Sequence, residues 1–208
     1  NKIIYLTFDD GPGKYTQGLL DLLDKYNVKV TFFVTNTHPD YQNLIAEEAK
    51  RGHTVAIHSA SHKYNQIYTS EQAFFDDLEQ MNSIIKAQTG NDASIIRFPG
   101  GSSNTVSKDY CPGIMTQLVN DVTARGLLYC DWNVSSGDAN SKPISTEQVV
   151  QNVISGVQSH NVSVVLQHDI KDFSVNAVEQ IIQWGQANGY TFLPLTTSSP
   201  MSHHRINN

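Results

Sequence analysis

The stretch IIYLTFDDGPGKYTQGLLDLLDKYNVKVTFFV, residues 3–34, carries the pattern that predicts the architecture of the chain. It opens with a short β-branched and aromatic run, Ile3 to Phe8, and closes with a second one, Lys29 to Val34. The residues between them, near Tyr15 to Lys25, have the apolar spacing of a helix. A strand, a helix and a strand in close succession are typical of a βαβ unit.

The same alternation continues to the end of the chain. Strands are predicted at Ile3 to Phe8, Lys29 to Val34, Thr54 to Ile57, Ile95 to Arg97, Leu127 to Trp132, Ser163 to Leu166 and Thr191 to Leu193. Helices are predicted near Tyr15 to Lys25, Tyr41 to Lys50, Ser70 to Thr89, Ser107 to Ala124, Thr146 to Ser159 and Val175 to Ala187. Repeated βα units with short connections indicate a single domain over residues 1–208, either a parallel barrel or a doubly wound sheet. The tail from Thr196 is interpreted as a terminal extension.

Composition excludes several classes of protein. The 208 residues include 20 acidic and 14 basic side chains, for a formal net charge of −6, which argues against a partner bound through nucleic acid phosphates. Hydrophobic residues make up 39% of the chain, which is enough for a core. No apolar run approaches the ~20 residues of a membrane span. Cys111 and Cys130 match no zinc or redox motif and are predicted to be free thiols.

Reactive side chains follow most of the predicted strands. They are Asp9-Asp10, His58, Arg97, Asp131-Trp132 and His168-Asp169. Because parallel βα architectures place their sites at the carboxyl ends of the strands, we expect these residues to converge on one face.

Two of these clusters have the chemistry of a metal site. Asp9 and Asp10 should point to opposite sides of a strand, and they reach one site only if the backbone turns at the Gly-Pro that follows. His58 and His62 are four residues apart, a spacing that puts both rings on one side of a helical turn. A set of two histidines and one aspartate leaves coordination positions open for water and substrate, as catalytic zinc sites do.

Four motifs stand in a defined order at these strand ends: Thr-Phe-Asp-Asp-Gly-Pro (7–12), His-Ser-x-x-His (58–62), Arg-Phe-Pro-Gly-Gly (97–101) and Leu-Gln-His (166–168). With this ordered set the chain resembles the polysaccharide deacetylases of the NodB-homology type, carbohydrate esterase family 4, and most of all the peptidoglycan N-acetylglucosamine deacetylases. The resemblance covers nearly the whole chain. It implies an α/β fold, a distorted (β/α)7 barrel.

The resemblance also implies roles for individual residues. Asp10, His58 and His62 would bind one divalent metal ion, and Asp9 would be the general base that takes a proton from water. His168 would be the general acid that protonates the departing amine, a step needed because an amide anion is a very poor leaving group. Zinc suits such a ligand set, and cobalt, nickel and manganese are alternatives.

The resemblance implies roles for two residues of the third motif and for one further aspartate. Arg97 matches the arginine that holds the catalytic base, and the backbone N–H of Gly100 matches the donor that binds the developing oxyanion; many family members carry Tyr at that position. Asp138 is favoured as the residue that orients His168. Asp131 is the alternative, because Asp131-Trp132 matches the family's Asp-Trp pair literally but lies inside a predicted strand.

The expected activity is metal-dependent hydrolysis of acetyl groups from N-acetylglucosamine units of a polysaccharide, with peptidoglycan favoured. A chitin-oligosaccharide deacetylase, a xylan O-acetyl esterase of the same family and a non-catalytic carbohydrate-binding relative are the alternatives. A serine hydrolase is disfavoured because no G-x-S-x-G motif is present. The chain opens Asn1-Lys2-Ile3 without a hydrophobic leader, and we expect a mature secreted or cell-wall-associated monomer.

Overall fold

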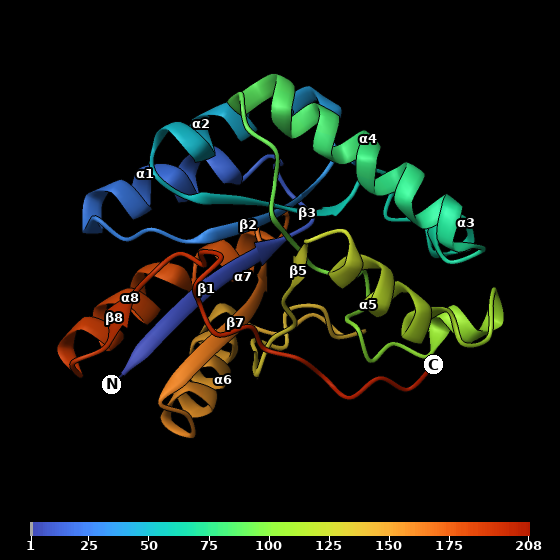
Figure 1. Ribbon diagram of the computed structural model, residues 1–208. Coiled ribbons are helices and arrows are strands. Elements are labelled where there is room, and N and C mark those ends of the chain that lie inside the picture. Colours follow the sequence, from blue (N-terminus) through green and yellow to red (C-terminus); the bar gives the residue numbers. More distant parts are fainter. Residues whose placement is uncertain (1) are drawn as a thin grey trace.

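Eight parallel strands form the sheet of this protein in a computed structural model that describes residues 2–208 (Figure 1). The strands are β1 (Ile3–Asp9), β2 (Thr31–Thr35), β3 (Thr54–Ser59), β4 (Ile95–Ile96), β5 (Leu128–Tyr129), β6 (Val134–Ser135), β7 (Val162–His168) and β8 (Thr191–Phe192). Their order is β5-β4-β3-β2-β1-β7-β6, and β8 pairs with the start of β1. Within this part of the chain every strand pair is parallel, as the βαβ pattern predicted.

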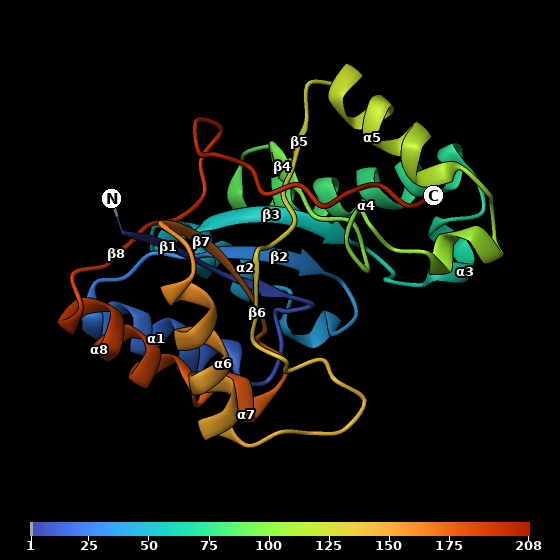
Figure 2. The same ribbon diagram turned by 90° about the horizontal axis from the view of Figure 1, so that it is seen from below.

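Helices cover the outer face of the sheet, as Figures 1 and 2 show. They are α1 (Thr16–Tyr26), α2 (Leu44–Lys50), α3 (Tyr64–Ile67), α4 (Glu71–Thr89), α5 (Ile114–Ala124), α6 (Thr146–Gln158), α7 (Asp172–Val175) and α8 (Val178–Ala187). Two short 3₁₀ turns, η1 (Pro39–Tyr41) and η2 (Val106–Asp109), precede α2 and α5. None of the helices in residues 2–208 is both long and apolar enough to cross a bilayer.

Several helix boundaries are set by local capping. Ser70 accepts a hydrogen bond from the N–H of Ala73 and begins α4, and Gly90, with φ of 82°, ends it as predicted. The helix predicted from Ser107 is wrong in its first part, because Pro112 lacks the N–H that a continuous helix needs there and α5 begins only at Ile114. The last predicted helix, Val175 to Ala187, corresponds to α8, which begins three residues later, and the short helix α7 before it was not predicted.

The central strands are buried on both faces, so they serve two cores. Ile4, Leu6 and Phe8 of β1 belong to the large cluster under the helices, while Tyr5 belongs to a smaller cluster with Phe33 of β2. The smaller cluster fills the concave, inner side of the curved sheet. Burial on both faces explains why these strands are continuous apolar runs rather than alternating ones.

The sheet curves into a half-barrel whose edge strands, β5 and β6, do not pair with each other among the described residues. This confirms the distorted (β/α)7 barrel. The strand predicted at Leu127 to Trp132 is present but shorter than predicted, because β5 covers only Leu128–Tyr129. Strand β5 ends at Tyr129 because the chain then leaves β4 and crosses the opening to join β7 as β6.

The C-terminal segment, residues 196–208, covers this opening, so it is not the simple extension that the sequence suggested. The N–H of Asp131 donates to the carbonyl of Ser202 at 2.7 Å, and the ring of His203 stacks on Tyr129 with centroids 3.8 Å apart. The segment, red in Figure 1, ends beside α5, where the N–H of Thr116 donates to the carbonyl of Asn208. Both cysteines are free, as predicted.

Candidate active site

A sharp turn after β1 brings two carboxylates to one place. Asp10 has a φ of 80°, and the carboxylate of Asp169 occupies the space that a side chain at Gly11 would need. As a result Asp9 Oδ2 and Asp10 Oδ1 lie 3.7 and 3.4 Å from the same nitrogen, Nε2 of His58. The backbone turn expected at Gly11 is therefore present.

Asp10, His58 and His62 form a cluster that fits a metal ion. The Nε2 atoms of both histidines lie 3.4 Å from Asp10 Oδ1, and one ligand atom from each residue lies within 4.8 Å of the others. Asp10 Oδ1 is buried and has no hydrogen-bond partner within residues 2–208. Two imidazole nitrogens and a carboxylate oxygen are a donor set that suits a divalent ion such as zinc.

The tautomer of His58 also favours metal binding. Its Nδ1 lies 2.7 Å from the backbone carbonyl of Arg97, which can only accept, so Nδ1 carries the proton and donates it. The unprotonated Nε2 then faces Asp10. A second partner that fixes ring and tautomer in this way is usual for metal-binding histidines.

The turn between the two histidines is not helical, and the helical turn predicted from their spacing is wrong. His62 has a φ of 53°, in the left-handed region, and Asp77 of α4 holds the loop in this form. The Asp77 carboxylate accepts from the Ser59 hydroxyl at 2.5 Å and from the N–H groups of Ala60 and Ser61 at 3.0 and 2.9 Å. The Ser59 hydroxyl in turn accepts from the N–H of His62 at 2.9 Å.

Asp77→Asn is expected to weaken metal affinity by about 10–100-fold, the usual cost of losing a residue that supports a ligand. An amide offers one acceptor oxygen, so it cannot replace both oxygens of Asp77. Titration of the metal-free protein with zinc would measure the change. Asp76→Asn, on the exposed side of the same helix, is the matched control and should leave the affinity unchanged. Equal affinities for the two variants would contradict the supporting role.

Arg97 is fully buried and ties Asp9 to the barrel interior. Its Nη1 donates to Asp9 Oδ1 at 2.8 Å and to Thr7 Oγ1 at 2.7 Å, while Nε and Nη2 donate to the carbonyls of Cys130 and Asp131. Only one nitrogen of the guanidinium contacts Asp9, so the pair is not a bidentate fork. This leaves Asp9 Oδ2 free to face the histidines.

His168, at the end of β7, is held by Asp138. The imidazole Nδ1 lies 2.8 Å from Asp138 Oδ1, and the other carboxylate oxygen accepts from the backbone N–H of His168 at 2.7 Å. Burial alone would lower the pKa of His168, but the hydrogen bond and charge of Asp138, with Asp9 and Asp10 nearby, outweigh it and raise this pKa to about 9. Nε2 of His168 lies 3.8 Å from Asp10 Oδ2, so its proton points toward the metal cluster.

Asp131, the alternative partner, contacts other groups. Its carboxylate accepts from the N–H and the hydroxyl of Ser102 and from the N–H of His204 at 2.9 Å. It therefore joins the loop that carries Gly100 to the C-terminal segment, and the geometry places Asp138, not Asp131, beside His168.

Asp131→Ala is expected to lower the free energy of unfolding by about 2 kcal/mol or more, because the N–H groups of buried Ser102 and half-buried His204 lose their acceptor, at a cost of about 1–3 kcal/mol for a buried group. Urea denaturation followed by far-UV circular dichroism would measure this. Asp109→Ala removes an exposed carboxylate and serves as the control. If the free energy of unfolding fell by less than about 1 kcal/mol, the contact between the Gly100 loop and the C-terminal segment would not depend on Asp131.

Gly100 lies on the same face with a φ of 79°. The hydroxyl of Tyr64 is 3.1 Å from the position that a Cβ at residue 100 would occupy. Burial, followed by the nearby charges of Asp10 and Asp9, raises the pKa of Tyr64. Neither Tyr64 nor Asp77 was found from the sequence, because no motif marks them and each acts across a tertiary contact.

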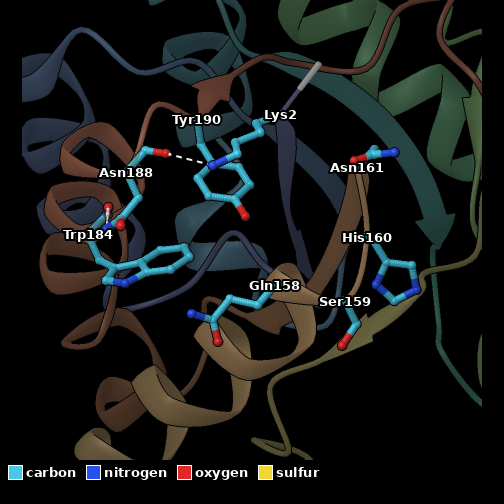
Figure 3. Close-up of a pocket in the computed structure, with 8 residues that line it drawn as sticks. All are labelled: Lys2, Gln158, Ser159, His160, Asn161, Trp184, Asn188 and Tyr190. Carbon is cyan, nitrogen blue, oxygen red and sulfur yellow. Dashed lines mark hydrogen bonds between the residues drawn. The ribbon is translucent and has the colours of Figure 1, made fainter.

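A separate cavity of about 370 Å³ opens at the other end of the sheet, where the strands begin (Figure 3). Its wall includes Lys2, Trp184 and Tyr190, with the indole and phenol rings 5.2 Å apart, and it contains no carboxylate. The amino ends of barrel strands are associated with stability rather than catalysis. We therefore place the reaction at the carboxyl ends, beside Asp10.

The half-barrel and the carboxylate–histidine cluster at its carboxyl edge together define a hydrolase of the deacetylase type. The family model of polysaccharide deacetylases matches residues 1–111. The chain belongs to the polysaccharide deacetylase family and is a hydrolase that removes acetyl groups from polysaccharides.

One curated relative and two solved structures are similar to this chain over most of its length. A peptidoglycan-N-acetylglucosamine deacetylase of Bacillus cereus is 33% identical over 196 residues, which cover 92% of this chain and 68% of the relative. The crystal structure of the catalytic domain of a peptidoglycan N-acetylglucosamine deacetylase from Eubacterium rectale is 97% identical, with a TM-score of 1.00 over 100% of this chain and 94% of that one. The polysaccharide deacetylase Bc1974 from Bacillus cereus is 31% identical, with a TM-score of 0.83 over 100% of this chain and 97% of that one.

Proposed function

We propose that this chain is one catalytic domain that hydrolyses the acetamide of N-acetylglucosamine units in peptidoglycan. The observation that supports the reaction most directly is the placement of two separately supported proton-transfer groups, Asp9 with Arg97 and His168 with Asp138, around the cluster of Asp10, His58 and His62. The choice of polymer is supported by the names of the relatives from Bacillus cereus and Eubacterium rectale.

Asp10, His58 and His62 would hold one divalent ion, and zinc is the proposed metal, with cobalt, nickel and manganese as alternatives. When bound, the ion would acidify a water molecule and polarise the acetamide carbonyl. Asp10 comes from the loop after β1, His58 from the end of β3 and His62 from the loop after β3, which Asp77 holds in place.

The protein side chains then divide the proton transfers between them. Asp9 takes a proton from the attacking water, and Arg97 orients its carboxylate through the 2.8 Å contact. His168 gives its proton to the departing amine, since an amide nitrogen leaves only when protonated. The N–H of Gly100 is the proposed donor to the oxyanion that forms between these two transfers.

Asp138→Asn is expected to move the alkaline limit of kcat to lower pH. The raised pKa of about 9 keeps His168 protonated, and thus able to act as an acid, at every pH below that value. Without the Asp138 charge, burial lowers the pKa of His168, so the proton is lost at a lower pH. A pH profile of kcat would measure the shift, with Asp172→Asn as an exposed control. If the alkaline limb of the kcat profile did not move, His168 would be excluded as the general acid.

The setting that fits this activity is outside the cell. We propose a secreted or cell-wall-associated protein, because the Bacillus cereus relative is named for peptidoglycan, a wall polymer. We also propose that it is a monomer. Sedimentation equilibrium would test the oligomeric state.

The deciding experiment is acetate release from N-acetylglucosamine oligomers, purified peptidoglycan and acetylated xylan, before and after chelation and with zinc or cobalt restored. Release from peptidoglycan that disappears on chelation and returns with metal is the expected result. Preference for the free oligomers would instead indicate a chitin-type substrate, and release only from acetylated xylan would indicate an O-acetyl esterase. Chelation-resistant release would contradict the metal-dependent reaction.

A further inference from the structure

Tyr64 lies at the edge of the metal cluster, two residues after His62, where it begins α3. Its ring is 5.6 Å from the His62 ring and stacks on Tyr68 with centroids 5.9 Å apart. Contacts on both sides leave the ring little freedom, and the side chain is only half-buried. Its hydroxyl is therefore both fixed in position and open to a ligand.

The Tyr64 hydroxyl and the Asn104 side chain border the space into which a side chain at residue 100 would extend. The hydroxyl lies 3.1 Å from the ideal Cβ position of residue 100, beside the backbone N–H that is the proposed oxyanion donor. A larger residue at position 100 would displace this hydroxyl. The glycine and the tyrosine therefore form a matched pair across two loops, one after β3 and one after β4.

Neighbouring polar groups are already bonded, and the Tyr64 hydroxyl is not. The hydroxyl of Tyr68 donates to the carbonyl of Pro99 at 2.7 Å, and Asn104 Nδ2 donates to the carbonyl of Gly101 at 2.8 Å. Within the described part of the chain, residues 2–208, the backbone carbonyl of Tyr64 accepts from the N–H of Tyr68, but no hydrogen bond engages its phenolic oxygen. A preorganised donor without a partner, next to the reacting atoms, is the feature by which side chains stabilise developing charge.

We propose that Tyr64 is a catalytic residue whose phenolic O–H donates a hydrogen bond to the acetamide oxygen as that oxygen becomes negatively charged. The inference rests on the proposed function. Water oxygen bonds to the carbonyl carbon as Asp9 takes a proton from it, the C=O π electrons move to the carbonyl oxygen, and this oxygen accepts from Tyr64. When the C–N bond breaks, the electron pair returns from oxygen to carbon and the amine takes a proton from His168. Tyr64 keeps its own proton throughout.

Tyr64→Phe tests the proposal, because it removes one oxygen and preserves the stack on Tyr68. We expect kcat for N-acetylglucosamine tetramer to fall about 10–100-fold, near the lower end of what one oxyanion donor contributes. KM should stay within about twofold, since a donor that acts in the transition state adds little to ground-state binding. Zinc affinity of the metal-free protein should be unchanged. Tyr110→Phe, at an exposed tyrosine, is the control.

Binding supplies a second readout that does not depend on turnover. A tetrahedral phosphonamidate analogue of the acetamide should bind the zinc-loaded Tyr64→Phe protein about 10–100-fold more weakly than the wild type, while the unmodified tetramer binds both equally. Equal affinity for the analogue, or a kcat within twofold of the wild type, would overturn the proposal. A rise in KM alone would also overturn it. If the wild-type protein released no acetate, the proposed function would fail, whereas analogue binding would still decide the role of Tyr64.

Discussion

Asp9→Asn is expected to lower kcat by about 10²–10⁴-fold, the usual contribution of a general base, while the protein retains its metal. The amide oxygen can still accept from Arg97 Nη1, so the side chain stays in place, but it no longer takes a proton from water. Acetate release would measure turnover, and elemental analysis of the purified variant would measure bound zinc.

The same substitution should also reduce stability, because it leaves the charge of Arg97 buried without its partner. Breaking a buried ion pair on one side costs about 3–5 kcal/mol, so turnover must be measured well below the melting temperature of the variant. Asp109→Asn, at an exposed carboxylate, controls for the loss of a negative charge. Full turnover by a folded, metal-loaded Asp9→Asn protein would remove Asp9 as the base.

His58→Ala is expected to reduce metal affinity by more than about 100-fold and to abolish turnover. Loss of a residue that merely supports a ligand costs 10–100-fold, so loss of the ligand itself should cost more. His58 also donates from Nδ1 to the carbonyl of Arg97. The variant therefore loses the contact that joins β3 to Arg97, the residue that holds Asp9. Zinc titration and acetate release would be measured together.

His160→Ala is the matched control for this variant, since His160 is exposed and its Nδ1 contacts the carbonyl of Gly156, at the end of α6. It should bind zinc and turn over as the wild type does. If His58→Ala kept stoichiometric zinc after dialysis against a weak chelator, the cluster of Asp10, His58 and His62 would not be the metal site.

Local patterns in the sequence were sufficient for most of the architecture. Strand β1 and helix α4 were predicted closely because their signals are contained within a few residues: a continuous apolar run in one case, Ser70 and Gly90 as caps in the other. Strand β6 was missed because two residues carry no periodicity, and their place beside β7 is a long-range contact.

The candidate site divides in a similar way. The four ordered motifs pointed to Asp9, Asp10, His58, His62, Arg97 and His168, since a parallel sheet brings all of its carboxyl ends to one edge. The sequence left Asp138 and Asp131 as alternatives. The geometry separates them because the crossing of residues 130–133 carries Asp131 toward Ser102 and the C-terminal segment, while Asp138 lies beyond β6 against His168.

The sequence by itself determined the βα order, the face on which the reactive residues gather and the family they resemble, because periodicity, caps and motif order are properties of short stretches. Only the tertiary structure decided what holds those residues in place. The support of the histidine loop by Asp77, the closure of the half-barrel by the C-terminal segment and the approach of Tyr64 to Gly100 join parts of the chain that lie far apart or in different loops. Such contacts depend on the packing of the whole domain, and no local pattern encodes them.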